Sequence, residues 1–419
     1  MEVKSGYKQT DVGIVPEDWE VQPLNRIATV VRGGSPRPAG DPRYFNGSYI
    51  PWLTVSALTQ MPPSRMIVAH TASNLTEEGS LHSRTLMPGT LVVSNSGATL
   101  GVAKILGIKC CANDGIAALL NLRESMSAPY LAHFVNTKTA YLRDVVAPGN
   151  GQPNLNTDLI GAFKVPIPPT RIEQEAIAGA LSDTDAFIES LEQLLTKQRQ
   201  IKQGVMQELL SGQRRLPGFT GEWAVRRLGD LGRWTGGMTP AMRNPDYWQP
   251  EAVPWVASGD VKSARLASTA LSISEFAVRQ GGAAVLPAGS VMLVTRSGIL
   301  RRHLPVALNM IPMAINQDIK ALLPNSDVLS EFLMQSITSH GDRILARCLK
   351  SGTTVESIEY QWLKEFPLPI PPLGEQAAIG AVLSDMDSGI AALGQQLAKA
   401  HYIKDGMTQE LLIGRIRLA

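Results

Sequence analysis

The sequence predicts an α+β protein in which two similar mixed α/β domains alternate with two long helices that pair as an antiparallel coiled coil. A gapless internal repeat is the main observation. Residues 173–216 align on residues 375–418, and 23 of the 44 positions are identical. The segments between the repeats carry short alternating runs separated by Gly and Pro turns, which is typical of short strands. Duplication of a domain followed by a helix explains both features.

The two long helices are predicted from proline boundaries and apolar spacing. Proline clusters at residues 166–169 and 367–372 precede the repeats, and a helix starts most readily just after such a cluster. Apolar residues then recur every three to four positions, as in a coiled-coil seam. The seam residues are Leu181, Ile188, Leu191 and Leu195 in the first copy, and Leu383, Ile390, Leu393 and Leu397 in the second. A helix over residues 173–211 would be ~58 Å long at ~1.5 Å per residue, which suits a spacer.

The division of the chain follows from the repeat. We expect domains at residues 1–166 and 217–369, with helical segments at 167–216 and 370–419. The domains also match each other loosely: each has a tryptophan (Trp19, Trp223), then a glycine turn (residues 33–36 and 236–240), then a Pro-Trp step. Helices are expected over residues 129–146 and 327–348. Antiparallel pairing of the long helices would relate the domains by an approximate two-fold axis.

Composition narrows the class of protein. The chain has 419 residues, 44% of them hydrophobic and 18% charged. It has no run approaching 18 apolar residues and no apolar core at the N-terminus, so we expect a cytoplasmic protein without membrane contact. Cys110, Cys111 and Cys348 show neither CxxC spacing nor a nearby histidine pair. They are expected to be reduced core thiols, and no metal site is predicted.

Charge is concentrated weakly in the domains. Residues 1–166 carry 14 Lys and Arg against 12 Asp and Glu, and residues 217–369 carry 15 against 13. The helical segments carry 6 against 7 and 4 against 5. The net charge of the chain is only +2, which by itself argues weakly against a large phosphate-binding surface.

Basic, amide and aromatic side chains recur in matching loops of the two domains. Arg and Lys bind phosphates and guanine edges, and Asn and Gln can pair with adenine. For a single residue of this kind a solvated turn is the simpler interpretation, but recurrence of the set favours nucleic-acid binding. The candidate DNA-binding residues are Arg32, Arg37, Arg43, Tyr44, Asn95, Ser96, Lys104, Asn150, Gln152 and Asn154 in the first domain, and Arg243, Asn244, Tyr247, Arg296, Arg301, Arg302, His303, Lys350 and Thr353 in the second.

Motifs for catalysis are missing from the sequence. There is no glycine-rich cofactor loop with an Asn/Asp-Pro-Pro-aromatic motif, and no GxxxxGK[ST] phosphate loop. We therefore expect no catalytic residue and no bound cofactor, and a DNA-modifying enzyme is disfavoured. The repeated acids Asp183, Asp185, Asp385 and Asp387 fall early in the helices, where we interpret them as capping or partner-surface groups.

The order of domain, long helix, domain, long helix resembles the specificity (S) subunits of type I restriction-modification systems, the HsdS family. The matching features are a Pro-rich entry followed by Glu-Gln-x-x-Ile (Glu173, Gln174, Ile177; Glu375, Gln376, Ile379), the glycine turn, the Pro-Trp step and Gly352-Thr353-Thr354. The first domain departs at the last feature, with Asn-Gly-Gln-Pro-Asn instead. The resemblance covers essentially the whole chain.

This resemblance implies a non-catalytic, sequence-specific subunit. Each domain would act as a target-recognition domain for one half of a bipartite, asymmetric site in double-stranded DNA, and the helices would set the gap. Two methyltransferase (modification) subunits would dock on the helices, and restriction/translocase subunits would join through the complex. Adenine methylation and ATP-dependent cleavage would belong to those partners. The alternative is a duplicated protein–protein scaffold without DNA binding, which the near-neutral charge supports.

Overall fold

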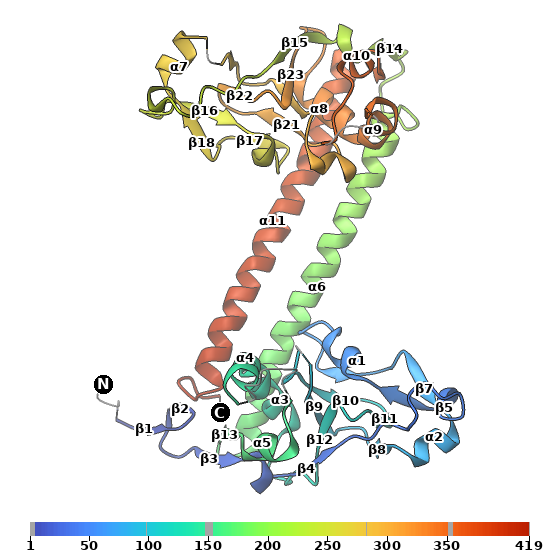
Figure 1. Cartoon of the computed structure of the whole chain (residues 1–419), viewed down its shortest axis with the longest axis vertical. Helices are drawn as coiled ribbons and strands as arrows, with labels where there is room; N and C mark the ends of the chain where they lie inside the picture. The colour runs from blue at the N-terminus through green and yellow to red at the C-terminus, as the bar shows by residue number, and fades with distance from the viewer. Residues whose placement is uncertain (1–4, 98, 147–153, 282, 351–354, 419) are drawn as a thin grey trace. The chain divides into compact units, whose positions relative to one another are not determined.

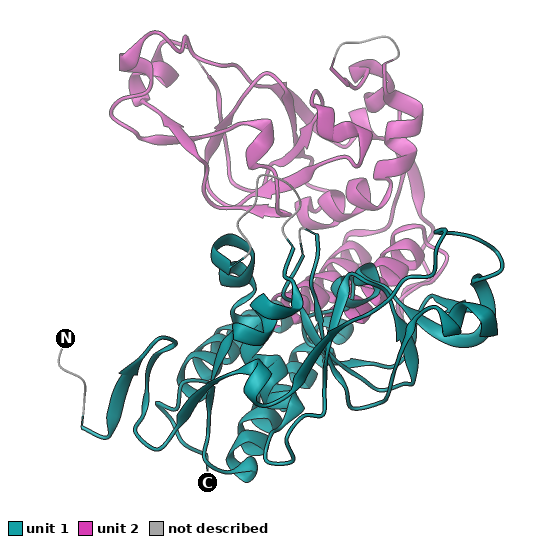
Figure 2. Cartoon of the chain, turned by 60° about the horizontal axis from the view of Figure 1, so that its bottom comes forward, with its two compact units in different colours: residues 1–194, 393–419 teal, residues 195–392 magenta. Residues whose placement is uncertain are grey.

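The computed structural model of the chain describes residues 5–97, 99–146, 154–281, 283–350 and 355–418. The chain divides into two compact units, residues 1–194 with 393–419 (unit 1) and residues 195–392 (unit 2), which Figure 2 colours separately. Each unit holds one mixed α/β domain and part of both long helices, α6 (Arg171–Leu210) and α11 (Leu373–Leu411) (Figure 1). The predicted fold class, with two repeated sheet domains and long helices, is confirmed.

The domain of unit 1 contains a five-stranded sheet, a four-stranded sheet and two strand pairs. The five-stranded sheet has the order β4 (Thr29–Arg32), β12 (Ile116–Leu120), β9 (Leu91–Ser94), β10 (Ala103–Leu106) and β6 (Ile67–Val68). The four-stranded sheet has the order β7 (Ser73–Leu75), β5 (Phe45–Leu53), β11 (Cys110–Ala112) and β8 (Arg84–Leu86). The strand pairs are β1 (Tyr7–Thr10) with β2 (Gly13–Pro16), and β3 (Glu20–Pro23) with β13 (Lys164–Ile167).

Unit 2 repeats this topology, except that it has no counterpart of the β1–β2 pair among its described residues. Its five-stranded sheet runs β15 (Gly232–Gly236), β23 (Ile319–Pro324), β20 (Val291–Val294), β21 (Val306–Asn309) and β17 (Arg265–Leu266). Its four-stranded sheet runs β18 (Leu271–Ile273), β16 (Val253–Val256), β22 (Met313–Ile315) and β19 (Val285–Leu286). Strand β14 (Ala224–Arg227) pairs with β24 (Pro367–Ile370). The duplication seen in the helices therefore extends over both domains.

Burial accounts for the apolar sequences of the central strands β9 and β20. All four residues of β9 and all four of β20 are buried, as expected for apolar runs covered on both faces of a sheet. In unit 1 the core extends to α3 (Ala128–Thr137), which contributes Tyr130 and Phe134. In unit 2, α8 (Ser330–Ser339) contributes Phe332 and Ile337. The three cysteines are buried and unpaired, as the sequence predicts.

The two shorter helices predicted within the domains both form, but each is interrupted. Over residues 129–146 the chain makes α3, α4 (Thr139–Tyr141) and a π-helical turn (Leu142–Val146), and over 327–348 it makes α8 and α9 (Gly341–Cys348). The breaks fall at Lys138 and His340, whose ψ angles are 10° and 6°. The remaining short helices are α1 (Val55–Thr59), α2 (Glu77–Leu81), α5 (Thr157–Ala162), α7 (Glu275–Arg279) and α10 (Tyr360–Lys364).

The glutamine of each Glu-Gln repeat ties the start of its long helix to the domain. Gln174 accepts a hydrogen bond from Ser127 N (2.8 Å) and donates to Pro168 O and Ser125 O, both at 3.2 Å. In unit 2, Gln376 accepts from Leu329 N (2.8 Å) and donates to Asp327 O (3.0 Å) and Pro371 O (2.8 Å). A primary amide can donate and accept at once, so one side chain joins three backbone segments.

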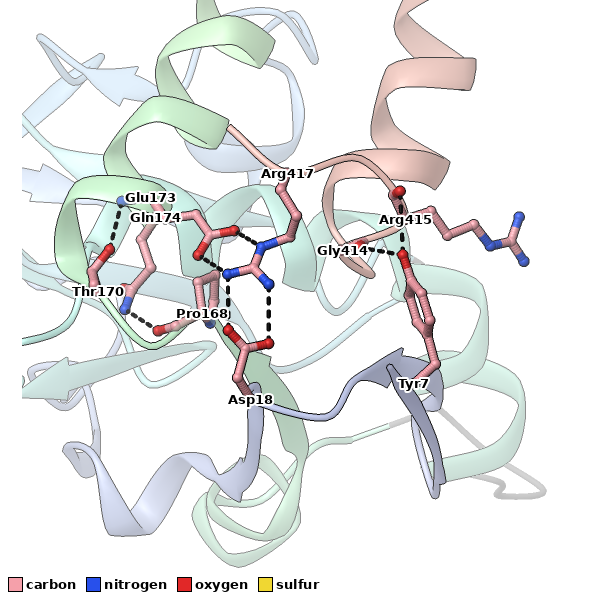
Figure 3. Close-up of polar contacts among 9 residues, drawn as sticks. All are labelled: Tyr7, Asp18, Pro168, Thr170, Glu173, Gln174, Gly414, Arg415 and Arg417. Atoms are coloured by element: carbon pink, nitrogen blue, oxygen red, sulfur yellow. Dashed lines mark hydrogen bonds and ion pairs between the residues drawn. The ribbon is translucent and has the colours of Figure 1, made fainter. Parts of the chain in front are cut away.

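The glutamate of each repeat is held by an arginine that follows the other long helix. Arg417, beyond α11, binds Glu173 at the start of α6 and also Asp18, at 3.0 Å to each oxygen (Figure 3). Its guanidinium also lies 5.8 Å from the centroid of the Trp19 ring. Tyr7 donates to the carbonyl of Gly414 or Arg415 beside it, at 3.4 Å.

Unit 2 contains the matching clamp. Arg215, beyond α6, binds both oxygens of Glu375 at the start of α11 (2.5 and 2.7 Å), and Trp223 Nε1 donates to the same carboxylate at 2.9 Å. Glu173 and Glu375 are 6% and 0% exposed. Because a buried carboxylate without a cationic partner is strongly destabilising, both domains depend on these arginines.

The long helices run antiparallel in each unit. In unit 1, Ile188 and Leu191 of α6 pack with Leu393, Leu397 and Ala400 of α11. Nearby, Asp185 lies 2.5 Å from Lys404 Nζ, and Thr184 contacts Met407. In unit 2, Lys202 Nζ lies 2.5 Å from Asp387. Residues later in α6 therefore contact residues earlier in α11, as in an antiparallel pair.

The other seam positions have mixed surroundings. Leu181 and Leu383 are fully buried and belong to the cores of their domains. Leu195 is buried, and Ile390 is half-buried.

The repeated aspartates correct one expectation. Asp185 and Asp387 lie more than three turns inside their helices, where each forms an ion pair with a lysine of the opposite helix. The interpretation of these two acids as capping groups is wrong. The helices begin at Arg171 and Leu373, and the helix dipole acts only within the first turn, so it does not reach these acids. Asp183 and Asp385 are exposed.

Among the described residues, α11 is the one helix whose length and mean hydropathy, 1.2, would allow a membrane span. Within that helix Glu375 is bound by Arg215 and Asp387 by Lys202. Leu383 of the same helix packs in the core of unit 2.

One polar cluster differs between the units. In unit 1, His133 of α3 is buried and bonds Ser182 Oγ through Nε2 (3.1 Å). Its burial, and secondarily the nearby Lys404 and Lys104, lower the pKa of His133 to about 4. The same place in α8 is occupied by Gln335, which donates to Asp387 at 3.4 Å. The histidine therefore adds a pH dependence that the second unit lacks at this position.

We predict that Leu191→Asp lowers the free energy of unfolding by about 3 to 5 kcal/mol, because it removes apolar contacts and buries a charge in the seam. Leu191 is 6% exposed, whereas Leu194, one turn along, is 41% exposed. Leu194→Asp is therefore the matched control and should change stability by less than about 1 kcal/mol. Urea unfolding followed by circular dichroism measures both. Equal midpoints for Leu191→Asp and the wild type would show that the seam is assigned wrongly.

We predict that His133→Gln reduces the loss of stability in mild acid. The folded pKa is about 4 against an ordinary value of 6.5, so the unfolded chain takes up the proton first as pH falls. Stability from the neutral histidine is complete above about pH 6.5 and is lost progressively down to about pH 4, by about 2 kcal/mol between pH 7 and 5. Urea titrations at both pH values should show a smaller difference for the variant. An identical difference in both proteins would contradict the prediction.

Candidate nucleic-acid interface

Three loop segments of unit 1 that are distant in sequence converge on residues 113–115, between β11 and β12. From the first glycine turn, Ser35 Oγ donates to Asp114 Oδ1 at 2.7 Å. From the turn after β9, Asn95 N donates to Gly115 O at 2.9 Å. Residue Asn154 forms a β-bridge with Ser96, and Leu155 N donates to Asn95 O at 2.7 Å. The loops predicted to bind nucleic acid thus meet at one edge of the five-stranded sheet, where β4 and β9 end and β12 begins.

Unit 2 gathers the equivalent segments at the equivalent edge. Thr239 of the glycine turn bonds Gln317, and Arg296 N donates to Asp318 O at 3.2 Å. The segment after residue 354 completes the site, since Ser297 N donates to Glu356 O at 3.0 Å and Ile358 N to Thr295 O at 2.8 Å. The backbone scaffold of the two sites is the same, and their side chains differ.

Exposed arginines surround Asp114 in unit 1. Arg37 lies 3.2 Å from Asp114 Oδ2, and Arg32 Nε donates to the backbone carbonyl of the same residue. The hydrogen bond from Ser35, and then the two arginines, hold the pKa of Asp114 below its ordinary value. These guanidinium groups are exposed and remain able to bind a second anion.

The cations of unit 2 have a comparable arrangement. Arg301 pairs with Glu356, and Lys350 lies 2.9 Å from Glu359. Hydrogen bonds from these two cations lower the pKa of both glutamates. Arg296, Arg302 and His303 are exposed beside them. Exposed ion pairs contribute little to stability and exchange partners readily, so the internal pairs do not prevent contact with phosphates.

Three side chains predicted to contact DNA from exposed loops are buried instead. Lys104 lies in strand β10, not in a loop, and is 2% exposed; its ammonium donates to Pro62 O (3.0 Å) and Arg65 O (2.5 Å). Burial lowers the pKa of Lys104 to about 8. Asn95 is 1% exposed, and Tyr44 is 8% exposed with its ring centroid 5.0 Å from that of His82. These side chains support their loops and do not face solvent.

A second group of predicted residues lies in the segments that precede strands β5 and β16 of the four-stranded sheets. Arg43 pairs with Asp41 at 2.7 Å, next to β5. In unit 2, Asn244 caps a short 3-10 helix through Asp246 N (3.1 Å), and Tyr247 stacks on Phe276 at 5.8 Å. Arg243 is exposed in the same segment. Asn150, Gln152 and Thr353 lie outside the described residues.

Sequence reasoning missed a cationic and aromatic cluster next to the unit 2 site. It consists of Trp234, Lys320, Tyr360 and Lys364. The available signal was Lys320, a charged residue inside the otherwise apolar strand Ile319–Pro324.

Comparison with known proteins identifies the class. The family model of the type I restriction modification DNA specificity domain matches the chain twice, over residues 16–202 and 220–400. The chain therefore belongs to this family of specificity subunits.

Individual relatives agree with this assignment. The EcoR124I/EcoR124II specificity subunit of Escherichia coli is 34% identical over 168 residues, which cover 40% of this chain and 42% of that protein. The chain thus spans less than half the length of this relative. The putative MjaX specificity subunit of Methanocaldococcus jannaschii is 20% identical, covering 99% of this chain and 97% of its own length. A crystal structure of a type I S subunit from M. genitalium shares the fold, with a TM-score of 0.59, 12% identity and 98% coverage of both chains.

Proposed function

We propose that the chain is the sequence-specific DNA-binding subunit of a type I restriction-modification complex. Its domains, residues 1–166 and 217–369, each recognise one half of a bipartite, asymmetric site in double-stranded DNA. The observation that carries this proposal is the convergence, in both units, of three loops with exposed cations on the same sheet edge. Duplicated scaffolds with different side chains suit the recognition of two different half-sites.

The helical segments, residues 167–216 and 370–419, act as the spacer in this proposal and present the docking surfaces for two modification subunits. Restriction/translocase subunits join through that complex. The chain supplies no catalytic group or cofactor, and the adenine methylation and the ATP-dependent cleavage belong to its partners. We place the assembly in the cytoplasm. The repeated clamps of Arg215 and Arg417 support a pair of equivalent docking positions.

A protein scaffold without DNA binding is the second candidate. It is favoured by the net charge of +2 and by the internal pairing of Arg37, Arg43, Arg301 and Lys350 with acids of their own domains. Mobility shifts of a random duplex over a range of salt concentrations separate the two functions, because phosphate contacts give a negative slope of log K against log salt. No binding at any salt, with modification subunits added, would select the scaffold.

We predict that Arg296→Gln weakens DNA binding. If Arg296 contacts a phosphate, affinity falls for every sequence and the magnitude of the salt slope falls by about 1. If it contacts a guanine edge, the cost is about 1 to 3 kcal/mol and is confined to one base pair. Arg279→Gln is the control, since Arg279 is exposed on α7 and pairs with Glu275 one turn earlier. Unchanged affinity and slope in Arg296→Gln would remove this residue from the interface.

We predict that exchanging residues 217–369 for the equivalent domain of another specificity subunit changes only one half-site. The physical reason is that each domain has its own sheets, its own core and its own converging loops. Mapping methylated adenines in cells that carry the chimaera and its partners measures both half-sites. A change in both half-sites, or in neither, would refute the modular proposal.

A further inference from the structure

We propose that unit 2 binds the DNA sugar-phosphate backbone through Lys320 and Lys364, which both lie against the ring of Tyr360 next to the recognition loops. This inference rests on the proposed function and adds a contact of stated chemistry to it. The partner group is a phosphate of the duplex, bound without reading base sequence.

The cluster is built from three elements of the domain. Tyr360 begins α10, and its ring centroid lies 5.7 Å from Lys320 Nζ of β23 and 5.6 Å from Lys364 Nζ. The ring of Trp234, on β15, meets the Tyr360 ring edge-on at 5.7 Å. Aromatic faces attract ammonium groups, so the Tyr360 ring, packed against Trp234, restricts the positions of otherwise flexible lysines.

The lack of an acidic partner distinguishes these lysines from Arg301 and Lys350 at the same site. Arg301 and Lys350 form ion pairs with Glu356 and Glu359. Within the described part of the chain, neither Lys320 nor Lys364 has a carboxylate oxygen within 4.0 Å. Two like charges held near one ring repel each other, and an external anion between or beside them relieves that repulsion.

The cluster adjoins the recognition loops through the backbone. Glu359, which precedes Tyr360, pairs with Lys350, and Ile358 N donates to Thr295 O at 2.8 Å. Gly236 of the glycine turn also borders it, because a Cβ atom there would lie 2.6 Å from Lys320 Nζ. The absence of a side chain at Gly236 leaves room at this ammonium. A duplex on the converging loops would bring phosphates to the cluster.

Unit 1 has no such cluster at the matching positions. By strand register Ala117 takes the place of Lys320. Helix α5 begins with Thr157 and carries Gly161 where α10 has Tyr360 and Lys364. The scaffold does not need these side chains, since the same fold forms without them. Their presence in one unit therefore favours a role in binding.

The test uses the complete chain with its modification subunits and compares the double variant Lys320→Gln/Lys364→Gln with wild type. Dissociation constants are measured over a salt series for a duplex carrying the recognised site and for an unrelated duplex. We expect the magnitude of the salt slope to fall by about 1 to 2 and affinity for both duplexes to fall by a similar factor, on the order of tenfold. The methylated sequence should stay the same.

Two further variants make the result specific. Lys320→Arg/Lys364→Arg keeps the charge and should keep the wild-type slope. Lys262→Gln removes an exposed lysine elsewhere in unit 2 and should have no effect. Melting temperatures of all variants should match wild type, which confirms folding.

Three outcomes would overturn the inference. A wild-type slope in the folded Gln variant would make the cluster purely structural. A changed methylated sequence would show base reading instead of phosphate binding. Failure of the wild-type complex to bind either duplex would refute the proposed function itself, and this failure differs from a loss confined to the variant.

Discussion

Burial of two carboxylates, Glu173 and Glu375, is the constraint on which the architecture depends. Each lies in the first turn of one long helix and is bound by an arginine that follows the other long helix. A buried acid needs its cation nearby, so neither helix can take its place in a domain unless the opposite helix ends beside it. The antiparallel arrangement is therefore imposed at the helix ends as well as along the seam.

The same residues link distant parts of the sequence. Arg417 stands two residues from the end of the chain, yet it binds Glu173 and Asp18 in the first domain. Arg215 makes the equivalent contact by reaching forward to Glu375. The ion pairs Asp185–Lys404 and Asp387–Lys202 are a second repeated contact between the long helices. Charged pairs at fixed positions set the register of the helices, whereas apolar seams alone tolerate slippage.

Sequence alone was sufficient for the helices and the duplication. The gapless identity between the repeats and the apolar spacing can be read without knowing the tertiary contacts. They predicted α6 to within two residues at each end, and they predicted that α11 exists within residues 370–419. The roles of polar residues depend on neighbours that no local pattern contains. Lys104 looked like a loop cation, but the carbonyls of Pro62 and Arg65 satisfy it inside a sheet. Asp185 looked like a cap because its partner, Lys404, lies 219 positions away.

The segments predicted to bind DNA converge in the structure, whereas some of their predicted side chains are buried. Glycine turns and β runs predicted which segments end at a sheet edge, and the structure brings those segments together. Whether a side chain there faces solvent depends on strand register. Asn95, one residue after β9, is buried, whereas Arg296, two residues after β20, is exposed. Sequence reasoning missed the cluster at Tyr360 because its members come from three separate elements.

Internal ion pairing reconciles the small net charge with the proposed DNA binding. In the recognition loops Arg37, Arg301 and Lys350 are each oriented by an acid of the same domain, while remaining exposed. Binding a phosphate there exchanges one anion for another, so the electrostatic gain is smaller than for a bare cation. Such a surface binds arbitrary DNA weakly, because the general attraction is reduced. Base-specific contacts then supply a larger share of the total affinity, and discrimination between sites increases. If each domain recognises one half-site, as proposed, paired cations suit that task better than a strongly positive surface.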